Sequence, residues 1–239
     1  MSALPLVLAG PLQSWGSASR FARRGTEHAP TKSGVLGLLA AALGRDRTAD
    51  LSDLAALRFG VRVDQPGVRV RDYQTAKHLV TGVSMPVSER YYLSDAVFVA
   101  AVEGDSELVA DLYRAVRNPV YLPYLGRRSC PPARPVDLGA PVEGTVEEVL
   151  EQTPWQAARW FQRQRRWRGE ERVELSTLVD AEPGQTRADS LRDLPLSFNP
   201  LHRRYALRSV SPGSVRVPNP TVRRTAPPDH DPVSALGGS

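Results

Sequence analysis

The segment at 91–102, YYLSDAVFVAAV, most constrains how this chain folds. It is rich in strand-forming residues and is apolar on both faces from Ala96 onward. A strand of this kind lies in the middle of a sheet, with other elements covering each face. We therefore expect a layered domain in which helices pack on a sheet, and a hydrophobic fraction of 41% is enough to build its core.

Strand and helix patterns alternate around this segment. The expected elements are strands at 4–9, 58–64, 68–73, 91–102 and 120–125 and helices at 33–43, 51–57 and 105–117. The resulting order, β-α-β-(β, loop)-β-α-β, predicts an α+β domain of the ferredoxin-like or RNA-recognition-motif type.

The two alternating runs at 58–64 and 68–73 are expected to form a hairpin with one basic face, which carries Arg62, Arg69 and Arg71. Residues 74–90 have no clear period, so they are expected to form a projecting loop or an irregular hairpin.

The character of the sequence changes after Gly126, where prolines mark a wandering connection. We divide the chain into a first domain at 1–135, a smaller C-terminal subdomain at 136–210 and a flexible tail at 211–239. Further strands are expected at 171–180 and 202–208.

All but two of the 31 basic residues are arginine, and the net charge is +5. Guanidinium groups bind phosphate and stack on bases, so this excess suits a nucleic-acid partner, although a GC-rich genome also produces it. The single cysteine excludes an internal disulfide and a cysteine-rich zinc site. No apolar run approaches the ~20 residues of a membrane span. We expect a soluble cytoplasmic protein without a metal or other cofactor and without a membrane partner.

Two short motifs suggest anion binding. Lys32, Ser33 and Gly34 open a helix, where free N–H groups favour a phosphate, but a capped helix whose glycines allow tight packing also explains them. Arg127 and Arg128 follow Gly126 at an expected strand end and form either a phosphate clamp or a solvated turn.

Tryptophans give two further candidates for base stacking. Trp15 lies beside Gly16 and is either a stacking platform or a core residue. The segment at 155–168 interleaves tryptophans with arginines. For this segment we favour an amphipathic helix whose tryptophans dock on the first domain while its arginines remain solvated.

Support for catalysis is thinner. The histidines are scattered without metal-ligand spacing, and no nucleophile-elbow motif occurs. Lys77 and His78 in the projecting loop either serve metal-free RNA cleavage, as electrostatic stabiliser and general acid–base, or are simply solvated loop residues.

Several spaced motifs, LAGPLQSWG, PTKSGVLGLLAAALG, RDYQTA, RYYLSDAVFVAAV and YLPYLGRRSCP, together resemble the CasD family. This family is the E-subtype branch of the fifth CRISPR-associated proteins, within the RAMP superfamily, and belongs to the antiviral Cascade surveillance complex. The resemblance covers about residues 4–135 and is faint from 136 to 208.

The resemblance implies a modified RNA-recognition-motif fold with an inserted β-hairpin thumb at about 75–90 and a small C-terminal extension. It implies a non-catalytic subunit that caps the 5′ handle of the CRISPR RNA and contacts the backbone subunit CasC and the large subunit CasA. Target DNA is then met only as part of the complex.

Combining the residues with the resemblance gives a set of RNA-binding candidates and no catalytic residue. The candidates are Gln13, Trp15, Lys32, Ser33, Gly34, Arg71, Tyr73, Arg90, Arg127 and Arg128. Of these, Gln13 and Trp15 either contact bases or support the loop that carries them. The alternative function is a metal-free endoribonuclease that processes CRISPR repeat RNA with Lys77, His78 and Tyr73.

Overall fold

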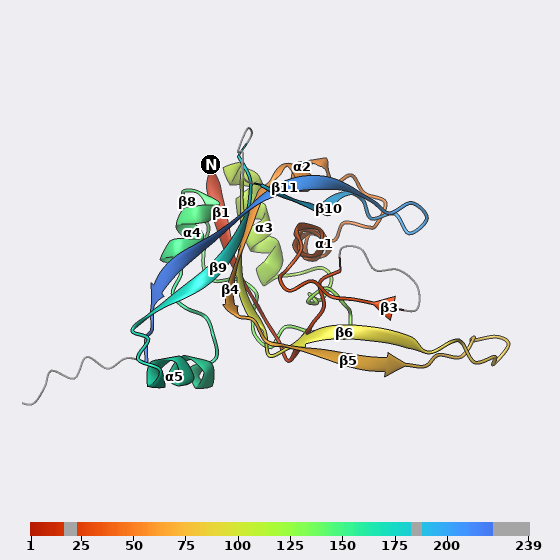
Figure 1. The fold of residues 1–239 in the computed structure, drawn as a ribbon. Helices are drawn as coiled ribbons and strands as arrows, with labels where there is room; N and C mark the ends of the chain where they lie inside the picture. The colour runs from red at the N-terminus through yellow and green to blue at the C-terminus, as the bar shows by residue number, and fades with distance from the viewer. Residues whose placement is uncertain (17–22, 183–187, 222–239) are drawn as a thin grey trace, which may run out of the picture.

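The computed structural model describes residues 1–16, 23–182 and 188–221, whose strands form two sheets (Figure 1). The larger sheet has the order β10-β11-β9-β4-β7-β1-β8, and its neighbouring strands are antiparallel. Its strands are β1 (Ser2–Ala9), β4 (Arg58–Gln65), β7 (Val97–Gly104), β8 (Val142–Glu143), β9 (Arg172–Asp180), β10 (Asp189–Ser197) and β11 (Arg204–Pro218). The mixed α+β class is as predicted, whereas the ferredoxin-like or RNA-recognition-motif arrangement stays a prediction.

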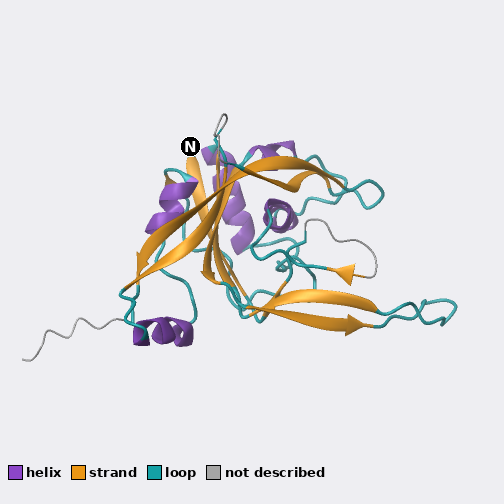
Figure 2. Cartoon of the chain, viewed as in Figure 1, coloured by secondary structure: helices purple, strands orange, loops and turns teal. Residues whose placement is uncertain are grey.

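The smaller sheet is built on a long hairpin that projects from the body of the molecule (Figure 2). Its strands are β2 (Leu12–Gln13), β3 (Arg23–Arg24), β5 (Val68–Gln74) and β6 (Ser88–Ser94). β5 and β2 pair antiparallel with β6, whereas β3 runs parallel to it.

Helices cover both faces of the larger sheet, and the central strand β7 shows why. Its Phe98 and Val102 pack in the main core with α1 (Lys32–Ala42) and α3 (Ser106–Arg117). Its Val99 packs in a second core with α4 (Val146–Gln152). The expected two-sided burial of this strand is confirmed. Two more helices are α2 (Ser52–Ala56) and α5 (Arg159–Trp167).

The single strand expected at 91–102 is wrong, because the run is divided between β6 and β7 in different sheets. Asp95 lies between them with φ 55°, a left-handed conformation that turns the chain. Its N–H donates to the carbonyl of Pro11 at 3.1 Å. Asp95 and Ala96 thus separate the projecting hairpin from the core sheet.

The expected hairpin at 58–73 is also wrong. β4 pairs with β7 and β9, whereas β5 pairs with β6. The intervening Gly67 has φ 69°, and a Cβ there would lie 2.4 Å from the Ser94 carbonyl. Arg62 is fully buried, with its Nε 2.7 Å from Asp64 Oδ1, so it belongs to no basic surface.

No strand forms at 120–125, because the N–H of Leu125 donates a hydrogen bond to the Cys130 carbonyl at 2.7 Å and holds this segment in a turn. The edge of β1 is paired instead by Val136, whose carbonyl accepts from Val7 at 2.7 Å, and by β8.

The C-terminal strands extend the larger sheet, because β9 pairs with β4. Residues 211–218 were expected in a flexible tail, but they lie in β11 and pair with β9. The expected tail beyond 221 lies outside the described residues, and the domain division at 135 stays a prediction.

Candidate nucleic-acid interface

The alternation of β5 places Arg69, Arg71 and Tyr73 on one face of the projecting hairpin. All three are exposed, and Tyr73 shows 55% of its surface to solvent. The guanidinium carbon of Arg71 lies 5.0 Å from the centroid of the Tyr73 ring. The hairpin therefore presents cations and an aromatic ring together.

Tyr91, which pairs with Arg71 on the neighbouring strand, organises the arginines around it. The guanidinium carbon of Arg69 lies 4.6 Å from its ring centroid and that of Arg23 lies 5.5 Å away. Arg23 Nη2 donates to the Tyr91 hydroxyl at 3.2 Å, and this hydroxyl donates to Glu89 Oε2 at 3.0 Å. The rings thus orient the guanidinium groups without neutralising them.

We call this surface the basic hairpin face, and it consists of Arg23, Arg69, Arg71, Tyr73 and Tyr91. Glu89 is its acidic neighbour, with a carboxylate oxygen 4.0 Å from Arg23 Nε. One carboxylate against three guanidinium groups leaves the surface positive. A cleft of about 540 Å³ opens beside it, lined among others by His28, Arg69, Leu93, Leu178 and Pro212.

Beyond this face, the hairpin ends in a hydrogen-bonded tip, which confirms the irregular hairpin expected at 74–90. The backbone N–H of His78 donates to the Val83 carbonyl at 2.8 Å, and the imidazole Nδ1 of His78 accepts from the N–H of Thr81 at 3.2 Å. Leu79 and Val80 are 98% and 87% exposed, so the tip is apolar and uncovered.

The arginine pair at 127–128 has two different environments. Arg127 donates to the carbonyls of Tyr91 at 3.2 Å, Arg24 at 2.9 Å and Gly25 at 3.3 Å, and its guanidinium carbon lies 4.7 Å from the Tyr92 ring centroid. It ties the hairpin to the core instead of clamping phosphate. Arg128 is exposed and stays a candidate ligand.

The turn that carries this pair is packed tightly. Gly126 has φ 82°, and a Cβ there would lie 1.8 Å from the Ser14 carbonyl. Cys130 ends the turn fully buried, and burial raises the pKa of its thiol.

Arg90 lies at the base of the hairpin, half-buried and paired in register with Asp72. Its Nε is buried and has no hydrogen-bond partner among the described residues. A buried guanidinium nitrogen without a partner is a donor that an incoming acceptor would satisfy.

Gln13 and Trp15 do not face solvent, so of their two expected roles, contacting bases or supporting the loop, the structure fits the second. Gln13 is fully buried, and its Nε2 donates to the carbonyls of Leu8 at 3.0 Å and Ala96 at 2.7 Å. Trp15 is 1% exposed and donates its Nε1 to Gln13 Oε1 at 3.1 Å. Both support the loop from inside.

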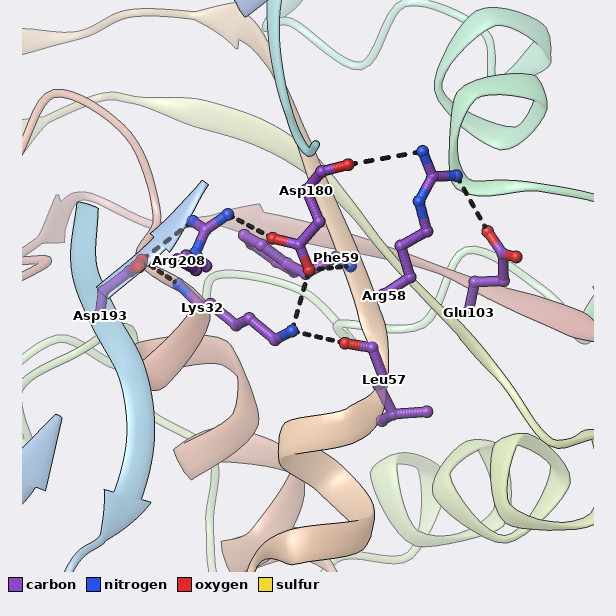
Figure 3. A network of polar contacts seen from close by, with 8 residues as sticks. All are labelled: Lys32, Leu57, Arg58, Phe59, Glu103, Asp180, Asp193 and Arg208. Carbon is purple, nitrogen blue, oxygen red and sulfur yellow. Dashed lines mark hydrogen bonds and ion pairs between the residues drawn. The ribbon is translucent and has the colours of Figure 1, made fainter. Parts of the chain in front are cut away.

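The helix start at 31–34 is an anion site that the protein itself fills (Figure 3). Thr31 caps the helix by accepting from the N–H of Gly34 at 3.2 Å, and the Lys32 N–H donates to Asp193 Oδ2 at 2.8 Å. Lys32 Nζ donates to Asp180 Oδ2 at 2.9 Å.

Burial closes this helix start to ligands. Lys32 is 4% exposed and Ser33 is 7% exposed, and a Cβ on Gly34 would lie 2.8 Å from the Trp15 ring. The expectation that Lys32, Ser33 and Gly34 meet phosphates is therefore wrong here, and the capped, tightly packed helix is the correct interpretation.

Arg208 completes what we call the buried ion network, which consists of Lys32, Asp180, Asp193 and Arg208 (Figure 3). Its Nε lies 2.6 Å from Asp193 Oδ1, and its Nη1 lies 2.5 Å from Asp180 Oδ1. Burial opposes the charge, but the two carboxylates prevail and raise the pKa of Arg208. Two cations and two anions leave no net charge for a ligand.

Sequence reasoning missed Arg23 and Tyr91 as interface residues and Asp180 and Asp193 as the partners of Lys32. The alternation of VRVRDY does signal that Arg69 and Arg71 share a face. No local signal shows which acids a fold will bring to a helix start from residues about 150 positions away.

Within the described residues there is no group of three or more metal-ligating side chains. Among the helices described, none combines the length and the hydropathy that crossing a membrane requires.

Residues 3–211 match the model of a family described as CRISPR-associated protein (Cas_Cas5). Over 158 residues, 58% of this chain and 70% of the relative, the chain is 39% identical to the CRISPR system Cascade subunit CasD of Escherichia coli (strain K12).

Two solved structures are similar over most of the chain. One is a crystal structure of a Cas protein, with 39% identity, a TM-score of 0.68 and coverage of 91% of this chain and 95% of that one. The other is a chain of a CRISPR RNA-guided surveillance complex, with 33% identity, a TM-score of 0.74 and coverage of 91% of both chains.

Proposed function

Because the chain belongs to the CRISPR-associated protein (Cas_Cas5) family, we propose that its basic hairpin face holds the 5′ handle of a CRISPR RNA. The chain is a subunit of a Cascade, a CRISPR RNA-guided surveillance complex of antiviral defence. In this proposal the succession of β1, α1, β4, β7, α3 and β8 is a modified RNA-recognition-motif domain, and the β5–β6 hairpin is its thumb.

One observation carries the proposal: Arg69 and Arg71 are exposed and held against the rings of Tyr91 and Tyr73. Guanidinium groups in this setting meet phosphates through their N–H donors, while an exposed ring offers a face for a base. Arg90 Nε, buried without a partner among the described residues, supports a phosphate at the base of the hairpin.

The experiment compares Arg69→Ala/Arg71→Ala with the control Arg114→Ala/Arg117→Ala on α3. The control removes two arginines as well, one of which lies over Tyr113 at 5.5 Å. We expect the hairpin variant to weaken handle binding and to lower the log–log salt slope by about 1.4 units, since each phosphate contact contributes about 0.7 units. Equal losses in both variants would reject the proposal.

We propose that the hairpin binds RNA without cutting it. His78 is exposed at the tip, and its Nδ1 already accepts a hydrogen bond from Thr81. The test incubates the assembled complex and the pure chain with repeat RNA. A site-specific cut that disappears in His78→Ala would favour the endoribonuclease.

The apolar tip of the hairpin suits a protein partner, and we propose that it contacts the CasC backbone subunit while the body meets CasA. Exposed apolar side chains that cluster in this way are typical of protein–protein interfaces. We expect that a short Gly-Ser turn in place of residues 76–87 leaves a folded monomer but prevents assembly. Entry of the shortened chain into a full complex would contradict this. We also propose that the subunit acts in the cytoplasm and contacts target DNA only as part of the assembled complex.

A further inference from the structure

Helix α5 packs Phe161 inward but leaves two tryptophans exposed on its outer side. The residue that it buries is Gln162, whereas Trp160 is 58% exposed and Trp167 is 84% exposed. The tryptophans of 155–168 were expected to dock on the body, but only Trp155, which precedes the helix, does so. Large apolar rings held in solvent mark an interaction surface.

The inner side of α5 is firmly anchored, so this exposure does not result from a loose helix. Gln162 Nε2 donates to the carbonyls of Trp155 at 3.2 Å and Ala157 at 2.9 Å. Asn219 Nδ2 donates to the Gln162 carbonyl at 3.1 Å. Phe161 packs edge-on against Trp155 and Trp160, with ring centroids 6.1 Å and 5.6 Å apart.

The outer side of α5 carries two parallel stripes. Trp160, Gln164 and Trp167 follow the helical i, i+4, i+7 spacing, so the two tryptophans are about 10 Å apart along the axis. The second stripe consists of Arg159, Arg163 and Arg166, and all three are exposed.

The charge of α5 indicates what kind of partner this surface binds. The segment 159–168 contains no carboxylate, and the nearest acid, Glu170, is already paired with Arg165 at 3.0 Å on the inner side. A partner must therefore bring many negative charges together with flat groups that stack on indole. Single-stranded nucleic acid offers phosphates and bases at every nucleotide, and stacking on aromatic side chains tolerates any base.

We propose that α5 is a second nucleic-acid-binding surface, on which bases of a single strand stack on Trp160 and Trp167 while phosphates meet Arg159, Arg163 and Arg166. It lies on the opposite side of the molecule from the hairpin tip (Figure 1). Because it uses only base faces and phosphates, it reads neither the handle sequence nor the sugar. The proposal does not depend on how the handle is held.

The test starts from the full chain carrying Arg69→Ala/Arg71→Ala, which separates the result from handle binding, and uses a 15-nucleotide oligo(dT) as the probe. We expect Trp160→Ala/Trp167→Ala to weaken oligo(dT) binding at least about tenfold, while Trp160→Phe/Trp167→Phe keeps most of it. Arg163→Ala/Arg166→Ala should lower the salt slope by about 1.4 units, and Arg114→Ala/Arg117→Ala should not change it.

Tryptophan fluorescence gives a second readout, because the exposed rings of α5 emit in solvent while Trp15 and Trp155 are buried. Oligo(dT) should quench the solvent-exposed emission, and this quenching should vanish in Trp160→Ala/Trp167→Ala. Thermal melting checks that each variant is folded. Unchanged oligo(dT) binding would overturn the proposal, as would tryptophan-dependent binding to vesicles of anionic lipid or to a poly-glutamate peptide with no effect on oligo(dT).

Discussion

The buried ion network and the basic hairpin face are both cationic clusters, yet only one is open to a ligand. The network pairs Lys32 and Arg208 with two carboxylates from β9 and β10. The hairpin face places its arginines against tyrosine rings, with Glu89 as the acidic neighbour. Carboxylates neutralise a guanidinium group, whereas rings only orient it, so the partner decides what remains for RNA.

The two clusters also serve different parts of the fold. The network joins the start of α1 to the C-terminal strands, so it holds the layers of the core together. The hairpin leaves the core at Asp95, and no element of the described chain covers its basic face. Mutations should therefore divide into those that change stability and those that change binding.

The largest effect is expected from Asp193→Ala, which leaves the guanidinium group of Arg208 and the N–H of Lys32 short of a buried partner. Breaking a buried ion pair on one side costs about 3 to 5 kcal/mol, which lowers the melting temperature of a chain of this size by roughly 6 to 20 °C. Thermal melting measures it. The control Asp111→Ala removes an exposed partner of Arg114 and should cost no more than about 1 kcal/mol.

Cys130 reports the same unfolding chemically. Its thiol is buried, and burial raises its pKa, so it should react slowly with a thiol reagent in the native chain. Asp193→Ala should speed this reaction, while the salt slope of handle binding in the folded fraction stays unchanged. Normal melting combined with lost binding would make the network a ligand site after all.

An intermediate effect is expected from Arg127→Ala, which removes three hydrogen bonds to backbone carbonyls between the hairpin and the core. We expect a loss of about 1 to 3 kcal/mol of stability, together with weaker handle binding because the hairpin is no longer held in place. Chemical denaturation measures the first and titration with handle RNA the second. Destabilisation without any change in binding would show that the orientation of the hairpin is irrelevant.

A smaller effect is expected from the neighbouring Arg128→Ala, whose side chain is exposed. Stability should change by no more than about 0.5 kcal/mol, and the salt slope of handle binding should fall by about 0.7 units if the side chain meets one phosphate. The two variants thereby compare Arg127, which anchors the hairpin, with the adjacent Arg128, the candidate RNA ligand.

The smallest effect is expected from His78→Ala. Since we assign the hairpin to binding, the amount of mature guide RNA should stay unchanged in cells that hold the other subunits. Northern analysis of precursor and mature RNA measures this, and accumulated precursor would transfer the hairpin to the catalytic class.

Sequence patterns predicted the elements whose signals are local. The helix at 33–43, the amphipathic helix after residue 105 and the strand at 171–180 appear within a few residues of their expected bounds. The failures concern how strands are divided and paired. Asp95 in a left-handed conformation divides the strand expected at 91–102, and the expected hairpin partners β4 and β5 lie in different sheets. The sequence of β10 did not predict a strand. Alternation tells which residues share a face but not which sheet the face joins.

The candidate site followed the same rule. Arg71 and Tyr73 are exposed as expected, because alternation alone places them outward. Lys32 and Trp15 had the right chemistry for RNA, but their exposure depends on Asp180 and on the loop at 126–130, which are distant in sequence. Motifs rich in glycine and basic residues are as characteristic of tight packing as of ligand binding.

The residue-for-residue pairing of β5 with β6 also governs how this arm can change in evolution. Pairing runs without a bulge from Val68 opposite Ser94 to Gln74 opposite Ser88. One residue inserted in each strand beyond Tyr73 would lengthen the hairpin by about 3.4 Å and keep every side chain below the insertion facing the same way. An unmatched insertion between Arg69 and Arg71 instead turns the outer half of β5 over, so Arg71 and Tyr73 exchange places with Asp72 and Gln74. The length of the hairpin can therefore change through matched insertions in both strands, whereas a single unmatched insertion between Arg69 and Arg71 disrupts the basic hairpin face.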